Sequence, residues 1–285
     1  MALSDKAEIH DNEVAYWNSE GGERWLARHE RVEGMLVPVA DALMSAAGIR
    51  TGNIVIDVGC GTGGMVTHLS DAVGPSGKVV ALDVSAPLIA RTKERTVSLS
   101  NVECVLGDAS RHPFGDEIAD LIISRLGVMF FGDPPAAFAH LRRALFPTGR
   151  IVFACWRSLA ENAWMSIPVT AAAPYLPPAD VPQPGAPGPF AFADSDRIRD
   201  ILTEAGYSAI SIEMFDPLFS LLDESGLEGA VDHATNFGPC ARRLAGQPDN
   251  VVAQVRSAVR DALREHETPT GLFLPGALWI VQAKR

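Results

Sequence analysis

The sequence is poor in the residue types that mark several classes of protein. Its four cysteines are scattered and form no C-x-x-C pair, which excludes a disulfide framework and gives no metal-ligand pattern, so we expect no metal. Basic residues number 24 against 35 acidic ones, a formal net charge of −11. A surface of this sign repels phosphate groups, so nucleic acid is not expected as a partner.

Long apolar runs are also missing. No stretch approaches the roughly 18 uninterrupted apolar residues that a membrane-spanning helix needs. Charged residues interrupt "MALSDKAEIHDNE" at the start of the sequence, where a secretion signal would be apolar. We therefore expect a cytoplasmic protein with no membrane insertion. The sequence leaves its oligomeric state open.

What the sequence does contain is a regular alternation of short apolar runs with helical patterns. This alternation is typical of a parallel sheet with helices on both faces. We predict an α/β fold with a doubly wound, mostly parallel seven-stranded sheet and a helical cap inserted before the last strand. The seven expected strands are "NIVIDVG" (53–59), "KVVALDV" (78–84), "VECVLGDA" (102–109), "ADLIISR" (119–125), "GRIVFACW" (149–156), "SAISIEMF" (208–215) and one closing strand within 271–285.

The first of these strands runs into a glycine-rich stretch, "VIDVGCGTGG", at residues 55–64. It contains the pattern G-x-G-x-x-G at Gly59, Gly61 and Gly64. Such a loop lets a ligand approach the backbone closely, and both dinucleotide-binding dehydrogenases and methyltransferases use one. Asp57 lies two residues earlier. Its carboxylate is unfavourable beside a pyrophosphate, because like charges repel, and favourable beside a cation.

Two more carboxylates follow the next two strands. Asp83 ends the second strand and can accept both hydroxyls of a ribose. Asp108 follows the third strand and can accept an adenine amino proton. Together with Asp57 they suit a ligand that carries a ribose, an adenine and a positive charge but no phosphate. S-adenosyl-L-methionine has these groups.

Four segments then resemble, in order, the motifs of class I S-adenosylmethionine-dependent methyltransferases. They are "VIDVGCGTGG", "VVALDVS", "VLGDAS" and "RALFPTGRIVFACW", and the resemblance is strong over about 50–156. The flanks resemble a bacterial branch related to the quinone-ring C-methyltransferases, with "AYWNSEGGERWL" similar to its amino-terminal lid. One departure is "LFPTGR", where Phe146 and Thr148 replace a usual lysine and glycine, and no loss of cofactor binding is expected from it.

The resemblance implies a role for each matching residue. Backbone groups of Gly59, Cys60 and Gly61 would line the methionine portion, and Asp57 would orient it. Asp83 would hold the ribose. The remaining cofactor contacts implied are Val84, Asp108 and Ala109 around the adenine, Ser124 and Arg125 at the methionine amino group and carboxylate, and Trp17 and Trp25 closing over the cofactor.

Several residues are candidates for the acceptor side. His233 is a candidate general base on the expected cap, although a lone histidine in a helical segment is commonly structural. The candidate substrate contacts are Trp156, Arg157, Trp164, Phe192 and Phe237. Their apolar and aromatic character favours a small, largely apolar acceptor.

These expectations divide the chain into regions. Residues 1–50 would form an N-terminal helical lid and 51–157 the cofactor-binding core. Residues 158–193, which include many prolines, would form a substrate-side loop. Residues 194–222 and 268–285 would complete the core sheet, and 223–267 would form the helical cap.

Two alternative functions stay open at this point. A nicotinamide-dependent oxidoreductase would use the same glycine pattern and would tolerate Asp57→Ala. An S-adenosylmethionine-binding enzyme that transfers no methyl group, such as a cyclase, would use the same pocket and release no S-adenosyl-L-homocysteine. The sequence does not identify the acceptor or the atom that is methylated.

Overall fold

The computed structural model describes residues 3–178, 185–222 and 225–285. Seven strands form the central sheet in the order β3-β2-β1-β4-β5-β10-β6. Strands β1 to β5 pair in parallel, and β10 is antiparallel to both β5 and β6. This confirms the predicted sheet. Its strands are β1 (Ile54–Val58), β2 (Lys78–Asp83), β3 (Val102–Leu106), β4 (Ala119–Arg125), β5 (Leu145–Trp156), β6 (Ser208–Phe215) and β10 (Leu278–Lys284).

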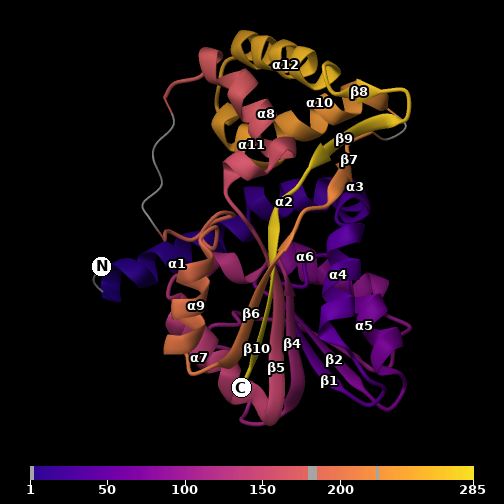
Figure 1. Ribbon diagram of the computed structural model, residues 1–285, viewed down its shortest axis with the longest axis vertical. Helices are drawn as coiled ribbons and strands as arrows, with labels where there is room; N and C mark the ends of the chain where they lie inside the picture. The colour runs from indigo at the N-terminus through magenta and orange to yellow at the C-terminus, as the bar shows by residue number, and fades with distance from the viewer. Residues whose placement is uncertain (1–2, 179–184, 223–224) are drawn as a thin grey trace.

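Helices cover both faces of this sheet (Figure 1). α4 (Val37–Ala47) and α5 (Val66–Val73) lie on one side, and α7 (Pro134–Ala144) and α9 (Ser195–Glu204) lie on the other. α6 (Ala86–Arg95) packs against β2 and β3. Each helix turns an apolar stripe to the sheet, as α7 does with Phe138 and Leu141, which are fully buried. The strand order reverses between β1 and β4, the position where ligands bind in open α/β sheets.

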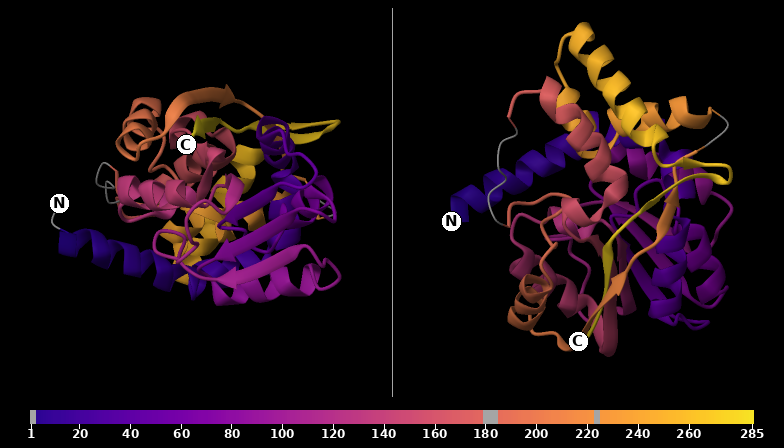
Figure 2. Two further views of the ribbon diagram at one scale, coloured as in Figure 1. Left: turned by 90° about the horizontal axis from the view of Figure 1, so that it is seen from below. Right: turned by 45° about the horizontal axis from the view of Figure 1, so that its top comes forward.

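Three further helices precede α4. They are α1 (Leu3–Trp17), α2 (Glu20–Ala27) and α3 (His29–Met35). α1 and α2 lie across the upper end of the sheet, between it and the second layer of helices (Figures 1 and 2). They therefore form one wall of any site above the carboxyl ends of the strands.

The cap stands above those strand ends (Figure 1). It consists of α8 (Ala163–Ala172), α10 (Gly226–Asn236), α11 (Gly238–Leu244) and α12 (Asp249–Arg264). α8 lies within the expected substrate-side loop 158–193, so that segment is not a loop throughout. Its apolar sequence "AWMSIPVTAA" packs against α11 and α12, which explains the helix despite Pro168. Within the proline-rich stretch, 179–184 lies outside the described residues.

The expected single closing strand is two strands. β9 (Gly271–Pro275) pairs with β7 (Leu218–Ser220) and β8 (Glu267–Thr268) in a small second sheet, and β10 belongs to the central sheet. Pro275 lacks an N–H, and the amide of Gly276 donates to the carbonyl of Pro217 at 2.8 Å. Thus β6–β7 and β9–β10 form one antiparallel ribbon that passes from the central sheet into the cap.

Across the described ranges, no helix has both the length and the apolar character required to cross a membrane.

Candidate active site

A cavity of about 880 Å³ lies between the carboxyl ends of the strands, the N-terminal helices and the cap. This volume is near the upper end of the range of roughly 300–1,000 Å³ for small-molecule sites. Most of the residues selected from the sequence line it. They are Trp17, Trp25, Asp57, Gly59, Cys60, Gly61, Asp83, Val84, Asp108, Ala109, Arg125, Trp156, Trp164 and Phe237.

The glycine loop forms the floor of the cavity. Gly59 and Gly61 have φ angles of +71° and +58°, a region that side chains disfavour. The amides of Gly59 and Cys60 both donate to the carbonyl of Leu82, and the amide of Gly61 donates to Asp83 Oδ2 at 2.8 Å. The loop is thereby fastened to the end of β2 and leaves its upper surface free of side chains at the two glycines.

Asp57 lies directly behind this loop. Its side chain is 2% exposed, and its Oδ2 atom has no hydrogen-bond partner in the part of the chain that the structure describes. The pKa of Asp57 is raised to about 7, mainly by burial and also by the nearby Asp83 and Glu33 carboxylates, while Arg125 acts in the opposite direction. An unsatisfied buried carboxylate of this kind favours a positively charged group beside it.

Asp83 is held by the backbone. Its oxygens accept from the amides of Gly61 and Ser85, both at 2.8 Å. Burial raises the pKa of Asp83, and these amide bonds act in the opposite direction. Since a carboxylate has about four acceptor positions, two remain for a ligand.

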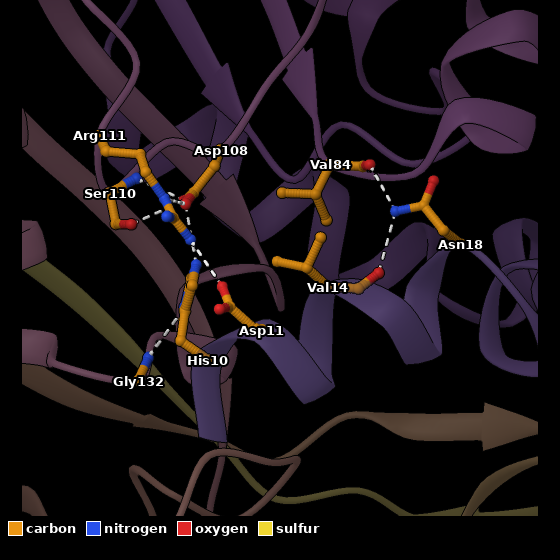
Figure 3. Close-up of polar contacts among 9 residues, drawn as sticks. All are labelled: His10, Asp11, Val14, Asn18, Val84, Asp108, Ser110, Arg111 and Gly132. Carbon is orange, nitrogen blue, oxygen red and sulfur yellow. Dashed lines mark hydrogen bonds and ion pairs between the residues drawn. The ribbon is translucent and has the colours of Figure 1, made fainter. Parts of the chain in front are cut away.

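Asp108 has a more crowded environment (Figure 3). Oδ1 accepts from the amide and the hydroxyl of Ser110, and Oδ2 accepts from Arg111 Nε and lies 2.8 Å from His10 Nε2. Burial opposes ionisation, but the hydrogen bonds from His10, Arg111 and Ser110 together hold the pKa of Asp108 well below its usual range. These four donors fill its acceptor positions. To bind Asp108, an adenine amino group would therefore have to displace one of these donors or share an acceptor position with it.

The histidine in this group comes from α1. The amide of Gly132 donates to His10 Nδ1 at 3.3 Å, so in the neutral ring Nδ1 accepts and Nε2 donates to Asp108. Asp11, the next residue, pairs with Arg111 at 3.2 Å. The N-terminal half of α1 is thus fastened to the ends of β3 and β4.

The other end of α1 is fastened to the residues after β2. Asn18 Nδ2 donates to the carbonyl of Val84 at 2.9 Å, and the amide of Ala86 donates to Asn18 Oδ1 at 3.0 Å (Figure 3 shows the first of these bonds). The hydroxyl of Ser85 also donates to the carbonyl of Trp17 at 2.6 Å. Between its two attachments α1 spans the part of the cavity where the adenosine was expected.

The opposite part of the cavity is aromatic. Ring contacts run from Trp17 to Trp25, with centroids 6.1 Å apart, and from Trp25 to Phe237 at 5.6 Å. Trp156 and Trp164 face each other at 5.5 Å. The wall continues with Met129, Phe130, Leu159, Met165 and Val169. These surfaces suit an apolar molecule.

Four of the selected residues do not line this cavity. Phe192 is 1% exposed and packs against Phe138 and Phe153 in the core, although residues 185–191 just before it line the cavity. Ser124 donates to the carbonyl of Val58 at 2.7 Å, which joins β4 to β1. For these two residues the predicted ligand contact is corrected to a structural role.

The other two are Arg157 and His233. Arg157 pairs with Asp216 at 2.6 Å and with Glu161, which holds it below the cap and away from the cavity. His233 is 3% exposed and stacks between Trp164 and Phe237. It lines a separate polar cavity of about 560 Å³, so the geometry does not support its predicted role as a base.

Among the lining residues that the sequence reasoning missed are His10, Glu13 and Glu33. His10 and Glu13 share a helical face with Trp17, and this spacing of three and four residues was the available signal. Glu13 Oε2 is buried without a hydrogen-bond partner among the described residues, and burial raises its pKa. Glu33 reaches the cavity from α3, and no local pattern distinguishes it from the other acids nearby. No group of three or more His, Cys, Asp or Glu side chains within the described ranges is placed to hold a metal ion.

The reversed strand order, the glycine loop after β1 and the cavity above it define a protein of the class I methyltransferase fold. Residues 56–153 match the family model described as a methyltransferase domain. The central part of the chain is therefore similar to a methyltransferase domain, in agreement with the sequence motifs.

Comparison with individual proteins agrees with this. The chain is 38% identical over 110 residues to demethylmenaquinone methyltransferase of Staphylococcus aureus, an alignment that covers 39% of this chain. It spans 46% of the length of that relative, somewhat less than half. The relationship therefore covers less than half of each of the two chains.

Solved structures show the same fold over more of the chain. The YcgJ protein of Bacillus subtilis is 14% identical with a TM-score of 0.56, over 86% of this chain and 97% of that one. Phosphoethanolamine N-methyltransferase 2 of Haemonchus contortus is 17% identical with a TM-score of 0.54, over 87% and 52%. The 4+2 cyclase SpnF is 18% identical with a TM-score of 0.53, over 87% and 80%.

Proposed function

We propose that this protein transfers the methyl group of S-adenosyl-L-methionine to a small, largely apolar organic acceptor. The observation that carries the proposal is the Asp57 carboxylate, buried behind the glycine loop with Oδ2 unpartnered among the described residues. A pyrophosphate at this loop would meet a buried acid, whereas the ammonium and sulfonium of S-adenosylmethionine would be stabilised by it.

The residues present fit this cofactor. The backbone of Gly59, Cys60 and Gly61 would line its methionine portion, and the two remaining acceptor positions of Asp83 would take the ribose hydroxyls. Val84 and the backbone of Ala109 would contact the adenine. Arg125 would face the methionine carboxylate, and Trp17 and Trp25 would cover the site. Asp108 stays a candidate for the adenine amino group if His10 or Arg111 shares its position.

The bound cofactor supplies an electrophilic methyl group. Transfer would join the methyl carbon to the nucleophilic atom of the acceptor as the sulfur–methyl bond breaks, and the electron pair of that bond would remain on sulfur, so that S-adenosyl-L-homocysteine would be the second product. An acceptor atom that carries a proton releases it to solvent. The protein aligns the two molecules and excludes water, and alignment of this kind lowers a barrier by about 7–11 kcal/mol in favourable cases. In-line displacement needs no base in the cavity when the acceptor is already anionic or neutral and unprotonated.

The aromatic wall supports an apolar acceptor. Trp156, Trp164 and Phe237 would contact it. The Staphylococcus aureus relative is named for a demethylmenaquinone substrate. A molecule of that apolar character would suit these surfaces. We infer a cytoplasmic location and no nucleic-acid partner from the composition alone.

One alternative has a specific observation in its favour. The cyclase SpnF has the same fold, so binding of the cofactor without methyl transfer is a second candidate function. The two differ in product. Incubation with methyl-labelled S-adenosylmethionine and a panel of small apolar acceptors yields a labelled acceptor and S-adenosylhomocysteine only in the methyltransferase case, and mass spectrometry identifies both.

Calorimetric titration tests the cofactor. We expect S-adenosylhomocysteine to bind and NAD not to bind. Asp83→Ala should weaken S-adenosylhomocysteine at least tenfold, since charge-assisted hydrogen bonds are worth roughly 1.5–3 kcal/mol each. Asp71→Ala, at an exposed position on α5, is the matched control. Tight NAD binding without a signal from S-adenosylhomocysteine would show that the protein is an oxidoreductase.

A further inference from the structure

A buried ion pair lies in the wall of the cavity beside the glycine loop. Arg125 Nη2, at the end of β4, is 2.6 Å from Glu33 Oε2 on α3. The two side chains are 9% and 16% exposed, and both line the cavity. Removing two charges from water costs several kcal/mol per ion. A salt bridge buried to this depth therefore does not by itself indicate that the two residues serve to stabilise the fold.

Glu33 is fixed over the exit of the glycine loop. The hydroxyl of Thr62 donates to Glu33 Oε1 at 3.4 Å. A Cβ at Gly64 would lie 1.9 Å from Glu33 Oε2, so any side chain there would displace the carboxylate. The third glycine of the G-x-G-x-x-G pattern thus leaves room for the Glu33 carboxylate in this position. The carboxylate is held in place at the end of the cavity where the methionine portion is expected.

The charges around this position are not balanced. Glu33 and Arg125 neutralise each other, and Asp57 adds a second carboxyl whose Oδ2 has no partner among the described residues. All three groups interact electrostatically. A ligand group with one carboxylate and one ammonium can replace the internal pair, with its carboxylate on the guanidinium and its ammonium on the acids.

We propose that Glu33 and Arg125 form a clamp for the amino-acid group of the cofactor, with Glu33 binding the ammonium and Arg125 the carboxylate. This inference rests on the proposed function, because it assigns residues to one part of S-adenosylmethionine. It adds a binding residue, Glu33, from outside the methyltransferase domain at 56–153. It also makes α3 part of the site, so the N-terminal helices recognise the amino-acid group as well as covering the cofactor.

The competing explanation is that the pair only fastens α3 to the sheet. The clamp and the structural explanation predict different effects on the affinities of two ligands. 5′-Methylthioadenosine shares the adenosine and thioether of S-adenosylhomocysteine but has no amino-acid group. A clamp contributes to binding of S-adenosylhomocysteine only, whereas a structural fastening contributes equally to both ligands.

The experiment is calorimetric titration of wild type and Glu33→Gln with both ligands. We expect Glu33→Gln to weaken S-adenosylhomocysteine about ten- to hundredfold and to leave 5′-methylthioadenosine within about twofold. Glu30→Gln, an exposed position on the same helix, should change neither. If Glu33→Gln does not fold, Glu33→Asp can be titrated with the same two ligands. The aspartate carboxylate is one methylene shorter and cannot reach both Arg125 and Thr62.

Equal loss for the two ligands, or no loss for either, would overturn the clamp and leave the proposed function standing. Failure of wild type to bind either ligand would instead remove the proposed function. The two failures are therefore distinguishable within one set of titrations.

Discussion

Gly59 and Gly127 approach each other so closely that neither can carry a side chain. A Cβ at Gly59 would lie 2.9 Å from the Cα of Gly127, and a Cβ at Gly127 would lie 2.7 Å from the carbonyl of Val58. The glycine loop after β1 and the turn after β4 thus pack backbone against backbone. This contact closes the floor of the cavity between the two strands where the strand order reverses.

This contact predicts different costs for two neighbouring glycines. Gly59→Ala introduces both a side chain at positive φ and a collision with backbone, whereas a Cβ at Gly61 would meet only Trp25 Nε1 at an ordinary 3.7 Å. We expect Gly61→Ala to lower the free energy of unfolding by about 1 kcal/mol, from backbone strain, and Gly59→Ala to lower it by clearly more. Urea denaturation measures both. Equal losses would contradict the close packing described for Gly59.

The pKa of Asp57 predicts a pH dependence of stability. Its value of about 7 in the folded protein exceeds the ordinary 3.8, so between pH 4 and 7 the unfolded chain loses this proton while the folded protein keeps it. The free energy of unfolding therefore falls as pH rises through this window, by up to about 4 kcal/mol at 1.36 kcal/mol per pKa unit. The groups that face Asp57 are Arg125, Asp83 and Glu33.

Asp57→Asn removes this loss, since an amide does not ionise. We expect the free energy of unfolding of Asp57→Asn, relative to that of wild type, to be higher at pH 8 than at pH 4. Urea denaturation of both proteins at both pH values measures this difference. Asp41→Asn, exposed on α4, should show no such gain. A gain that is the same at both pH values would show that Asp57 is ionised in the folded protein throughout.

The two attachments of α1 predict how fast the cofactor leaves. With His10 on Asp108 and Asn18 on Val84 and Ala86, α1 spans the adenosine side of the cavity. His10→Ala removes the first attachment. We expect S-adenosylhomocysteine to dissociate about tenfold faster from this variant, because the loss of about 1.4 kcal/mol of binding free energy corresponds to a factor of ten. Stopped-flow fluorescence of Trp17 and Trp25 follows the release. Asn12→Ala, exposed on α1, is the control, and an unchanged rate for His10→Ala would show that α1 does not retain the ligand.

Alanine substitution should affect stability at Phe192 and turnover at Phe237. Phe192 is in the core, so Phe192→Ala should lower the free energy of unfolding by about 3–5 kcal/mol and leave turnover per folded molecule unchanged. Phe237 lines the cavity, so Phe237→Ala should lower turnover of the acceptor found by labelled screening and keep S-adenosylhomocysteine affinity within about threefold. Equal turnover in Phe237→Ala and wild type would place the acceptor elsewhere.

The core sheet could be predicted because its signals are local. Each strand is a short apolar run bounded by glycine, proline or a helical pattern, and the residues after the strands meet at one edge of a parallel sheet by necessity. This is why Asp57, Asp83 and Asp108 were selected correctly as neighbours of one cavity. The interruption of the closing strand at Pro275 was also visible in the sequence, but an apolar run continues on both sides of it.

The acceptor side could not be predicted in the same way. Whether Phe192 or Phe237 reaches the cavity depends on how the cap packs over the sheet, and nothing in their local sequences differs in that respect. Glu33 depends on a contact with Arg125, 92 residues away. The spacing of His10 from Glu13 and Trp17 indicates only a shared helical face, and its contact with Asp108, 98 residues away, is what gives it a place in the site.

The ribbon of β6–β7 and β9–β10 determines which parts of the protein can move independently. The ribbon carries the cap on two paired strands, and the side chain of Asn162, just before α8, bonds to both the amide and the carbonyl of Ala277 within it. Three chain segments thus anchor the cap to the sheet, whereas α1 is held by side-chain contacts, among them the hydrogen bond of His10 to Asp108 and the ring contact of Trp17 with Phe130. We therefore expect the acceptor side of the cavity to keep its shape while the cofactor enters and leaves along the N-terminal helices, so that the side chains on the acceptor side set its selectivity.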